Sequence, residues 1–394
     1  MVDDISPVLH FCRSRSDWVR ETVEALVRLE SPSDDKAAVD RCGAELTRRL
    51  VALGAEVTRS SQTTCGDHVR AEWRPRAAET RPRAPILLLG HFDTVWPVGT
   101  LERMPLHERD GCLHGPGIFD MKAGIAASML AIRALTEFCK ATPHLVMLWT
   151  TDEEIGSRTS RALIEERARA SSAVLVLEPS LPRGAAKTSR KGVGEFALTV
   201  HGVAAHAGLD PGKGVSAVHE LARQVLALEA FQDPDRGITI NVGVIAGGSR
   251  TNVIADQATA QIDVRVQTME DAARLEGAIR GLRPSRPSIR LEVSGGIDRP
   301  PLERSGDVVR LYEQAREVAA TLGRELGEGA AGGASDGNFT GALGVPTLDG
   351  LGPEGDGAHA SHEHVVLDNL SWRGAFLAGL IESLARSSTS AIQR

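Results

Sequence analysis

The stretch ILLLGHFDTVWPVGTLERMPLHERDGCLHGPGIFDMKAG, residues 86–124, decides the fold because it joins an apolar run to a series of reactive side chains. The apolar residues Ile86–Leu89 predict a buried strand. His91 and Asp93 follow, and side chains two residues apart on extended chain point the same way. Asp120 comes after a loop rich in Pro and Gly, just before a predicted helix. This arrangement is typical of half of a metal site.

Apolar strands alternate with helices around this stretch. Residues 144–150 and 173–177 are apolar runs of strand length, and acidic residues follow each of them. Residues 121–138 form a predicted helix whose small residues suit close packing on a sheet. The alternation predicts an α/β fold with a mostly parallel sheet sandwiched by helices. Because such sheets bind ligands beyond the carboxyl ends of their strands, we expect the site at that edge.

The pattern changes near residue 190, after which the predicted order is strand–helix–strand–strand–helix–strand. This order and length are typical of a ferredoxin-like α+β domain. Long helices and apolar strands then return, which indicates an insertion. We therefore predict a discontinuous first domain, residues 1–189 and 299–394, and an inserted domain, residues 190–298. Residues 74–85, with three prolines and four arginines, predict a solvated turn.

Composition restricts the class of protein. The chain has 394 residues, 42% hydrophobic and 25% charged, which suits a globular protein of two domains. A net charge of −7 and an aromatic content of 4% do not favour a nucleic-acid partner. Five cysteines without CxxC spacing predict neither disulfides nor a thiolate zinc site. The sequence has no long apolar run and no recognisable signal peptide, so we expect a soluble, cytoplasmic protein without a membrane partner.

Further side chains of the metal-binding type follow the other predicted strands or lie in a Gly-rich loop. They are Glu153 and Glu154 in TTDEEIGS, Glu178 in LEPS, and His359 in GDGAHASHEH. With His91 and Asp120 they suit two divalent ions of the zinc type, one carboxylate bridging the ions. One of the two adjacent glutamates would bind metal while the other acts on the bound water as a general base. Asp93 would hold the second ring nitrogen of His91.

The chain resembles a known family at these positions. The resemblance rests on eight motifs in order over about residues 85–365, which are GHFDTV, GPGIFDMKAG, TTDEEIGS, LEPS, HGVAAHAG, SRTNVIAD, ASDGNF and GDGAH. They are similar to those of the dizinc metallopeptidases that include glutamate carboxypeptidase, aminoacylase and related dipeptidases. Eight separated motifs in the right order make the resemblance specific.

The resemblance implies a role for each matched residue. It implies five zinc ligands: His91 and Glu178 for one ion, Glu154 and His359 for the other, and a bridging Asp120. It further implies that Glu153 is the general base and that Asp93 orients His91. The same ligand types also accept cobalt or manganese.

The family's inserted domain is a lid that carries substrate-binding groups and usually the dimer contact. The matching positions here are His206, Asn252 and Arg265. The resemblance implies a homodimer in which His206 reaches the partner's active site and helps to stabilise an oxyanion. Arg265 and Asn252 would grip the free carboxylate of the substrate, because the guanidinium group presents a fork that suits a carboxylate.

The last motif leaves an ambiguity, since GDGAHASHEH holds three histidines. His359 follows the GA pair as in the family, with Glu363 and Val365 at the expected downstream spacing, and His362 is its rival as a ligand. His362 and His364 stand where the family more often has acidic or aromatic residues.

Two features lean toward the carboxypeptidase-like branch of the family: Glu178 in place of an aspartate, and the GPG at 115–117. We therefore expect a hydrolase that releases a C-terminal amino acid from a small peptide or N-acyl amino acid, through a metal-bridging water activated by Glu153. An N-acyl-amino-acid amidohydrolase and a dipeptidase are the alternatives. A non-catalytic binder of metal or peptide is less favoured because the ligand set and the base are intact.

Overall fold

The computed structural model describes residues 6–74, 84–139 and 143–390. The chain divides into two compact units. Unit 1 takes in the residues up to 188 together with 304–330 and those from 335 onward, and unit 2 takes in 189–303 and 331–334. Most of the turn predicted for 74–85 lies outside the described residues. Within them, no helix is both long and apolar enough to cross a bilayer.

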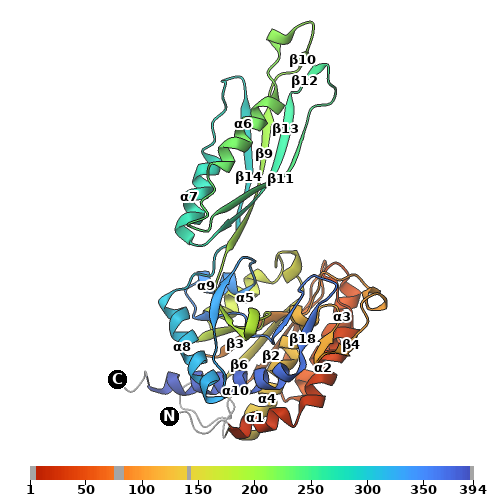
Figure 1. The fold of residues 1–394 in the computed structure, drawn as a ribbon, viewed down its shortest axis with the longest axis vertical. Coiled ribbons are helices and arrows are strands. Elements are labelled where there is room, and N and C mark those ends of the chain that lie inside the picture. The colour runs from red at the N-terminus through yellow and green to blue at the C-terminus, as the bar shows by residue number, and fades with distance from the viewer. Residues whose placement is uncertain (1–5, 75–83, 140–142, 391–394) are drawn as a thin grey trace. The chain divides into compact units, whose positions relative to one another are not determined.

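A six-stranded sheet forms the centre of unit 1 (Figure 1). Its strands, in spatial order, are β1 (Glu56–Ser60), β2 (His68–Trp73), β6 (Leu145–Thr150), β3 (Ile86–His91), β7 (Ala173–Val176) and β16 (Thr347–Leu348). The pairs β6–β3, β3–β7 and β7–β16 are parallel, while β1–β2 and β2–β6 are antiparallel. Strands β3, β6 and β7 are buried throughout, as their apolar sequences require. The mostly parallel sheet predicted from the sequence is confirmed.

Helices cover both faces of this sheet, and alternate residues of β3 point into different cores. Leu88 packs in the larger core with the helices α1 (Ser6–Arg13), α2 (Ser16–Arg28), α3 (Lys36–Ala52), α4 (Ala123–Phe138), α8 (Gly306–Thr321) and α10 (Leu367–Ser390). Leu87 and Leu89 pack in a smaller core with α5 (Arg161–Arg169) and α9 (Gly337–Ala342). A strand buried on both faces explains why its sequence is apolar without alternation.

Unit 2 has the ferredoxin-like arrangement that the sequence predicts (Figure 1). Its elements along the chain are β9 (Gly192–His201), β10 (Ala205–His206), α6 (Ala217–Glu229), β11 (Thr239–Gly247), β12 (Val253–Ile254), β13 (Gln257–Val266), α7 (Met269–Arg280) and β14 (Arg290–Arg299). The main sheet has the order β11-β13-β9-β14 and is antiparallel throughout. Helices α6 and α7 share an apolar core with it.

A second, small sheet in unit 1 was not predicted. It joins β4 (His107–Arg109) and β5 (Cys112–His114) to β17 (Gly355–Asp356) and β18 (His364–Val366). These strands are two or three residues long and mostly polar, so they lack the periodicity that identifies strands. Strands β5 and β18 pair directly, which brings the opening stretch of the sequence against the loop that carries His359.

Helix α4 also differs from its prediction at its first turn. The sequence predicts a start near Met121, whereas the regular helix begins at Ala123. A π-helical turn, Ile118–Lys122, precedes it, with non-helical dihedral angles at Asp120 and Met121 and a cis peptide between them. The carboxylate of Asp120 is therefore carried on irregular backbone rather than on a helix.

Candidate metal centre

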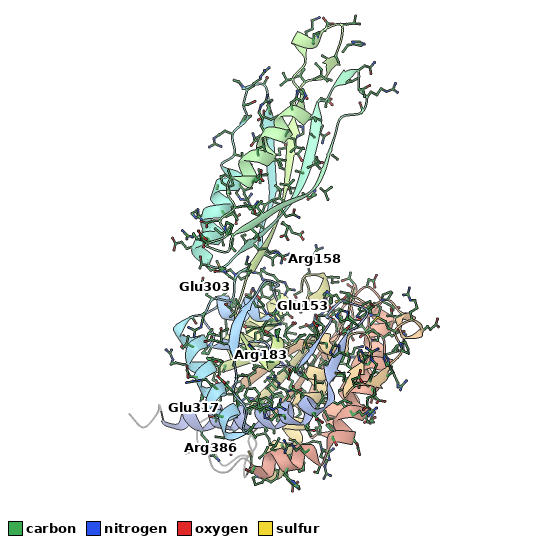
Figure 2. All side chains as sticks on the ribbon, in the orientation of Figure 1. Glu153, Arg158, Arg183, Glu303, Glu317 and Arg386 are labelled. Carbon is green, nitrogen blue, oxygen red and sulfur yellow. The ribbon has the colours of Figure 1, made fainter. Side chains whose placement is uncertain are left out.

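The predicted ligands of unit 1 gather at the carboxyl ends of neighbouring strands. His91 is the last residue of β3, Glu153 and Glu154 form a turn just beyond β6, and Glu178 follows β7 (Figure 2, where Glu153 is labelled). The structure thus brings together groups that are far apart in the sequence, at the edge of the sheet where the parallel topology predicts a site.

Asp120 lies between the two histidines of this cluster. Its Oδ1 is 3.2 Å from Nε2 of His91, and its Oδ2 is 3.4 Å from Nε2 of His359. Glu178 Oε1 is 3.4 Å from the same nitrogen of His91, and both carboxylate oxygens of Glu154 are 3.2 Å from Nε2 of His359. Each histidine therefore has its own terminal carboxylate, and the two share Asp120.

Two overlapping groups in the cluster have ligand atoms within 4.8 Å of one another. One contains His91, Asp120 and Glu154, and the other contains His91, Glu153 and Glu178. His359 is the histidine of the GDGAHASHEH segment that contacts Asp120 and Glu154. Imidazole and carboxylate groups at this spacing form a donor set that suits divalent metal ions.

The electrostatics of the cluster favour bound positive charge. Hydrogen bonds to Asp120 and Glu154 raise the pKa of His359 to about 10, against a smaller lowering by burial. Burial would lower the pKa of His91, but hydrogen bonds to Asp120, Asp93 and Glu178 raise it well above its usual value. Burial would likewise raise the pKa of Asp120, which the two histidines instead hold low. The carboxylates thus stabilise a cation between them, and metal ions can replace the imidazolium protons.

Asp93 lies against the second ring nitrogen of His91, which donates a hydrogen bond to the Asp93 backbone oxygen. Nδ1 of His91 lies 3.1 Å from the backbone oxygen of Asp93 and 3.4 Å from its Oδ1. The other carboxylate oxygen accepts from the Ser33 hydroxyl at 2.7 Å and from the backbone N–H of Glu154 at 3.3 Å. Through Asp93, the ring of His91 is therefore connected to the turn that carries the glutamate pair.

Glu363 has a structural role that the sequence did not predict. It is fully buried, and its carboxylate accepts hydrogen bonds from the backbone N–H groups of Gly117, Phe119 and Asp120 and from the indole of Trp96, at 2.8–3.0 Å. Burial raises the pKa of Glu363 to about 7, although these hydrogen bonds oppose the shift. Glu363 thus links the loop of His359 to the irregular turn of Asp120.

Asp336 and Asp152, to which the sequence assigned no role, hold the turn of Glu153 and Glu154. Asp336 accepts hydrogen bonds from the hydroxyl groups of Thr150 and Ser157, on either side of the turn. Asp152 accepts from the backbone and hydroxyl of Thr159, at 2.7 and 2.8 Å. Both aspartates are buried, so these charged hydrogen bonds fix the turn firmly. Nothing in the sequence reveals this pairing, because the partners are brought together only by the fold.

The predicted residues of unit 2 do not form a single group. His206 of β10 and Asn252, the residue just before β12, are exposed neighbours, and the backbone N–H of Ala207 donates to the Asn252 carbonyl. The small β10–β12 sheet lies beyond the Gln257 end of β13 (Figure 1). Arg265 is eight residues from Gln257, which at about 3.3 Å per residue is about 26 Å. Within one chain, Arg265 is therefore far from His206 and Asn252.

Arg265 also has a partner within its own strand. Its guanidinium donates to both carboxylate oxygens of Asp263, at 2.9 and 2.8 Å. Both side chains are about one-third exposed, so the pair is accessible to a ligand. A substrate carboxylate at Arg265 would share the guanidinium with Asp263 or displace it.

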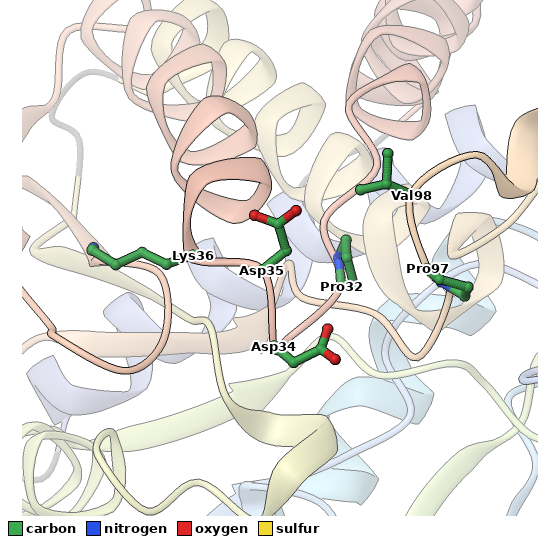
Figure 3. Close-up of a pocket in the computed structure, with 6 residues that line it drawn as sticks. All are labelled: Pro32, Asp34, Asp35, Lys36, Pro97 and Val98. Atoms are coloured by element: carbon green, nitrogen blue, oxygen red, sulfur yellow. The ribbon is translucent and has the colours of Figure 1, made fainter.

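A surface pocket of about 440 Å³ lies next to the loop of Asp93 (Figure 3). Its lining residues are Pro32, Asp34, Asp35, Lys36, Pro97 and Val98. Pro32 pairs with Thr94, and Ser33 donates to Asp93, so the pocket wall is joined to the orienting carboxylate. The side chain of Asp35 accepts a hydrogen bond from the Ala38 N–H and caps α3. The side chain of Asp34 points away from this helix in Figure 3.

Residues 87–383 match the family described as Peptidase family M20/M25/M40. The chain belongs to this family. It is 30% identical over 378 residues to carboxypeptidase G2 from Pseudomonas sp. strain RS-16, covering 93% of this chain and 89% of that one. It is also 30% identical over 374 residues to succinyl-diaminopimelate desuccinylase from Acidovorax ebreus, covering 87% and 92%. The family resemblance inferred from the eight motifs is confirmed.

Solved structures support the fold. Aminopeptidase PepT from Bacillus cereus superposes with a TM-score of 0.78 at 24% identity, covering 94% of this chain and 99% of that one. A dinuclear metal-binding peptidase of the M20 family from Bacillus subtilis gives a TM-score of 0.68 at 15% identity, covering 95% and 99%. M20 peptidases are metal-dependent hydrolases, and the donor set around Asp120 fits such an enzyme.

Proposed function

We propose that this M20 hydrolase is a dizinc, carboxypeptidase-like enzyme that releases a C-terminal amino acid from a small peptide or N-acyl amino acid. The observation that supports it most is the position of Asp120, whose two carboxylate oxygens each face a different histidine. One carboxylate with a histidine on each side suits a bridge between two ions. His91 and Glu178 would hold one ion, and Glu154 and His359 the other.

The ions, when bound, acidify water and polarise the amide carbonyl, as zinc does in hydrolases. The chain's own residues move the protons. Glu153 accepts a proton from the attacking water and delivers it to the leaving amine, so that the product leaves as a neutral amine. Asp93 keeps the ring of His91 in its ligating orientation, and the buried Asp336 and Asp152 keep Glu153 in place.

His206 is the proposed donor to the oxyanion. Its Nδ1 accepts hydrogen bonds from the backbone N–H groups of Gly208 and Leu209, at 3.1 and 3.0 Å. A nitrogen that accepts carries no proton, so the N–H of the neutral ring is on Nε2, which is the tautomer that an oxyanion donor needs. Arg265 and Asn252 bind the carboxylate of the released amino acid.

We further propose that the active site is completed by a second chain. His206 and Asn252 are at one end of unit 2 and Arg265 is about 26 Å away along β13, too far for one substrate of a few residues. In a homodimer, Arg265 of one chain and His206 of the other would meet at each site. Strand β11 is an edge strand with exposed Val244 and Ile245, so it offers a pairing surface for the partner.

The two kinds of relative suggest two different substrate classes, and the proposal has to choose between them. Carboxypeptidase G2 and succinyl-diaminopimelate desuccinylase are equally similar to this chain in identity, and we favour the first because its match covers more of the chain. N-acyl amino acids and dipeptides are further substrates with the same scissile bond and free carboxylate. All five cysteines are free, which suits a reducing compartment such as the cytoplasm.

A substrate panel with and without chelator tests the proposal. Purified protein is loaded with Zn²⁺, Co²⁺ or Mn²⁺ and assayed on peptides and N-acyl amino acids ending in glutamate, on N-succinyl diamino acids, and on dipeptides. We expect chelator-sensitive release of C-terminal glutamate. Turnover that favours succinyl substrates would replace the carboxypeptidase assignment with desuccinylase, and metal binding without turnover on any substrate would contradict catalysis.

A further inference from the structure

Three histidines that the metal centre does not use form a row across the small sheet of unit 1. His107 on β4 is opposite His114 on β5, and His114 is opposite His364 on β18. Side chains directly opposite on antiparallel strands share one face of the sheet. The ring centroids of His107 and His114 are 4.8 Å apart, and those of His114 and His364 are 4.9 Å apart. We call these three residues the histidine row.

The two outer rings of the row each use one nitrogen as a donor to the backbone. His107 Nδ1 donates to the Pro105 carbonyl at 2.8 Å, and His364 Nδ1 donates to the His362 carbonyl at 2.9 Å. A neutral imidazole has one N–H, so the second nitrogen of each ring keeps its lone pair. Across the ranges that the structure describes, we find no hydrogen bond to that second nitrogen.

The protonation state and exposure of the row suit metal binding. Burial lowers the pKa of His114, and the rings of His364 and His107 lower it further, so His114 is neutral near pH 7. His107 is exposed and the other two are half-buried, so an ion can enter from solvent. Hydrogen bonds from the first nitrogen to backbone carbonyls are the usual way in which a ligating histidine is oriented.

We propose that the histidine row is a further metal site, which binds one Zn²⁺, Ni²⁺ or Cu²⁺ ion between His114 and either of its neighbours. Late first-row ions prefer imidazole ligands. With metal–nitrogen bonds of about 2.0–2.1 Å, the two nitrogens must come within about 4 Å of each other. The planes of His107 and His114 are 12° apart and those of His114 and His364 are 36° apart, so one ring of a pair has to turn about its side-chain bonds before both lone pairs face the same ion. The row contains no carboxylate, so Mg²⁺ and Ca²⁺, which take oxygen ligands, are excluded as its ions.

The site is distinct from the centre around Asp120 but lies on the same loop. His362, whose carbonyl accepts a hydrogen bond from His364 of the row, stands between His359 and Glu363 in the sequence. The row also accounts for His364, which departs from the family's acidic or aromatic residues at that position.

Counting bound ions in the full-length enzyme tests the proposal. Wild type and His114→Ala are dialysed to equilibrium against micromolar free Ni²⁺ or Zn²⁺, and bound metal is measured by mass spectrometry. We expect wild type to hold one ion more than His114→Ala, whatever number the centre around Asp120 holds. The single variants His107→Ala and His364→Ala should each keep the extra ion with weaker affinity, because His114 still has one histidine neighbour in each of them. The double variant His107→Ala/His364→Ala should lose the ion.

His10→Ala is the matched control, because His10 is an exposed histidine of unit 1 outside the row. It should bind as many ions as wild type. With Cu²⁺, the electron paramagnetic resonance spectrum of wild type should show coupling to two imidazole nitrogens that His107→Ala/His364→Ala lacks, and circular dichroism checks that both variants fold. Equal ion counts in wild type and His114→Ala, or no second nitrogen in the Cu²⁺ spectrum, would overturn the proposal.

Discussion

The two units hold their functional side chains in opposite ways. In unit 1, His91, Asp93 and Glu178 are buried, and hydrogen bonds from several parts of the chain fix the groups around Asp120. In unit 2, His206 and Asn252 are exposed, and Arg265 is at the far end of its strand. One chain can therefore assemble the groups that are proposed to bind metal and move protons. The groups proposed to bind substrate lie too far apart in one chain to meet at a single small substrate.

Replacing the general base should have the largest effect, and it tests whether unit 1 alone carries the chemistry. We expect Glu153→Gln to lower kcat by about 10³-fold, because general-base catalysis typically contributes 10²–10⁴-fold. Metal content should stay at the wild-type level, since the five proposed ligands are intact. Glu166→Gln, at an exposed position on α5, is the control. Near-normal turnover in Glu153→Gln would show that the base is elsewhere.

Removing His206 should have the next largest effect, and it tests whether unit 2 acts across a dimer. Loss of one oxyanion donor typically lowers kcat by about 10²–10³-fold. We therefore expect the kcat of His206→Ala to decrease by a factor in this range, while its metal content stays at the wild-type level. Equal mixing of His206→Ala and Glu153→Gln chains should restore about a quarter of wild-type activity, because half of the dimers carry one working site of two. No recovery in the mixture would place His206 in its own chain's site.

Weakening the link made by Glu363 should have the smallest effect of the three. Gln keeps only one acceptor oxygen for the four donors around it, so Glu363→Gln should loosen the turn of Asp120. Groups that orient metal ligands typically contribute 10–100-fold in metal affinity, and we expect a loss in this range by competition with a chelator. Glu317→Gln on the exposed side of α8 (Figure 2) should bind metal normally. Unchanged metal affinity in Glu363→Gln would show that the turn of Asp120 keeps its conformation without the hydrogen bonds to Glu363.

Much of this fold follows from local sequence, and some of it cannot. Apolar runs such as Ile86–Leu89 reveal buried strands, and the residue after each run marks the edge where ligands gather. The roles of Glu363 and Asp336 depend on partners 179 or more residues away, which no local pattern encodes. Strands β4, β5, β17 and β18 are equally hidden, because each is only two or three residues long and too short to show a period-2 pattern.

The pairing of β5 with β18 has a consequence for how the protein is made. His359, Glu363 and β18 all follow unit 2 in the sequence, whereas His91 and Asp120 precede it. Domains generally fold as units while the ribosome is still adding residues. Unit 2 is therefore complete in the nascent chain before the last proposed ligand has been synthesised. A growing chain offers only part of the proposed ligand set, so the complete set first exists at the final stage of biosynthesis.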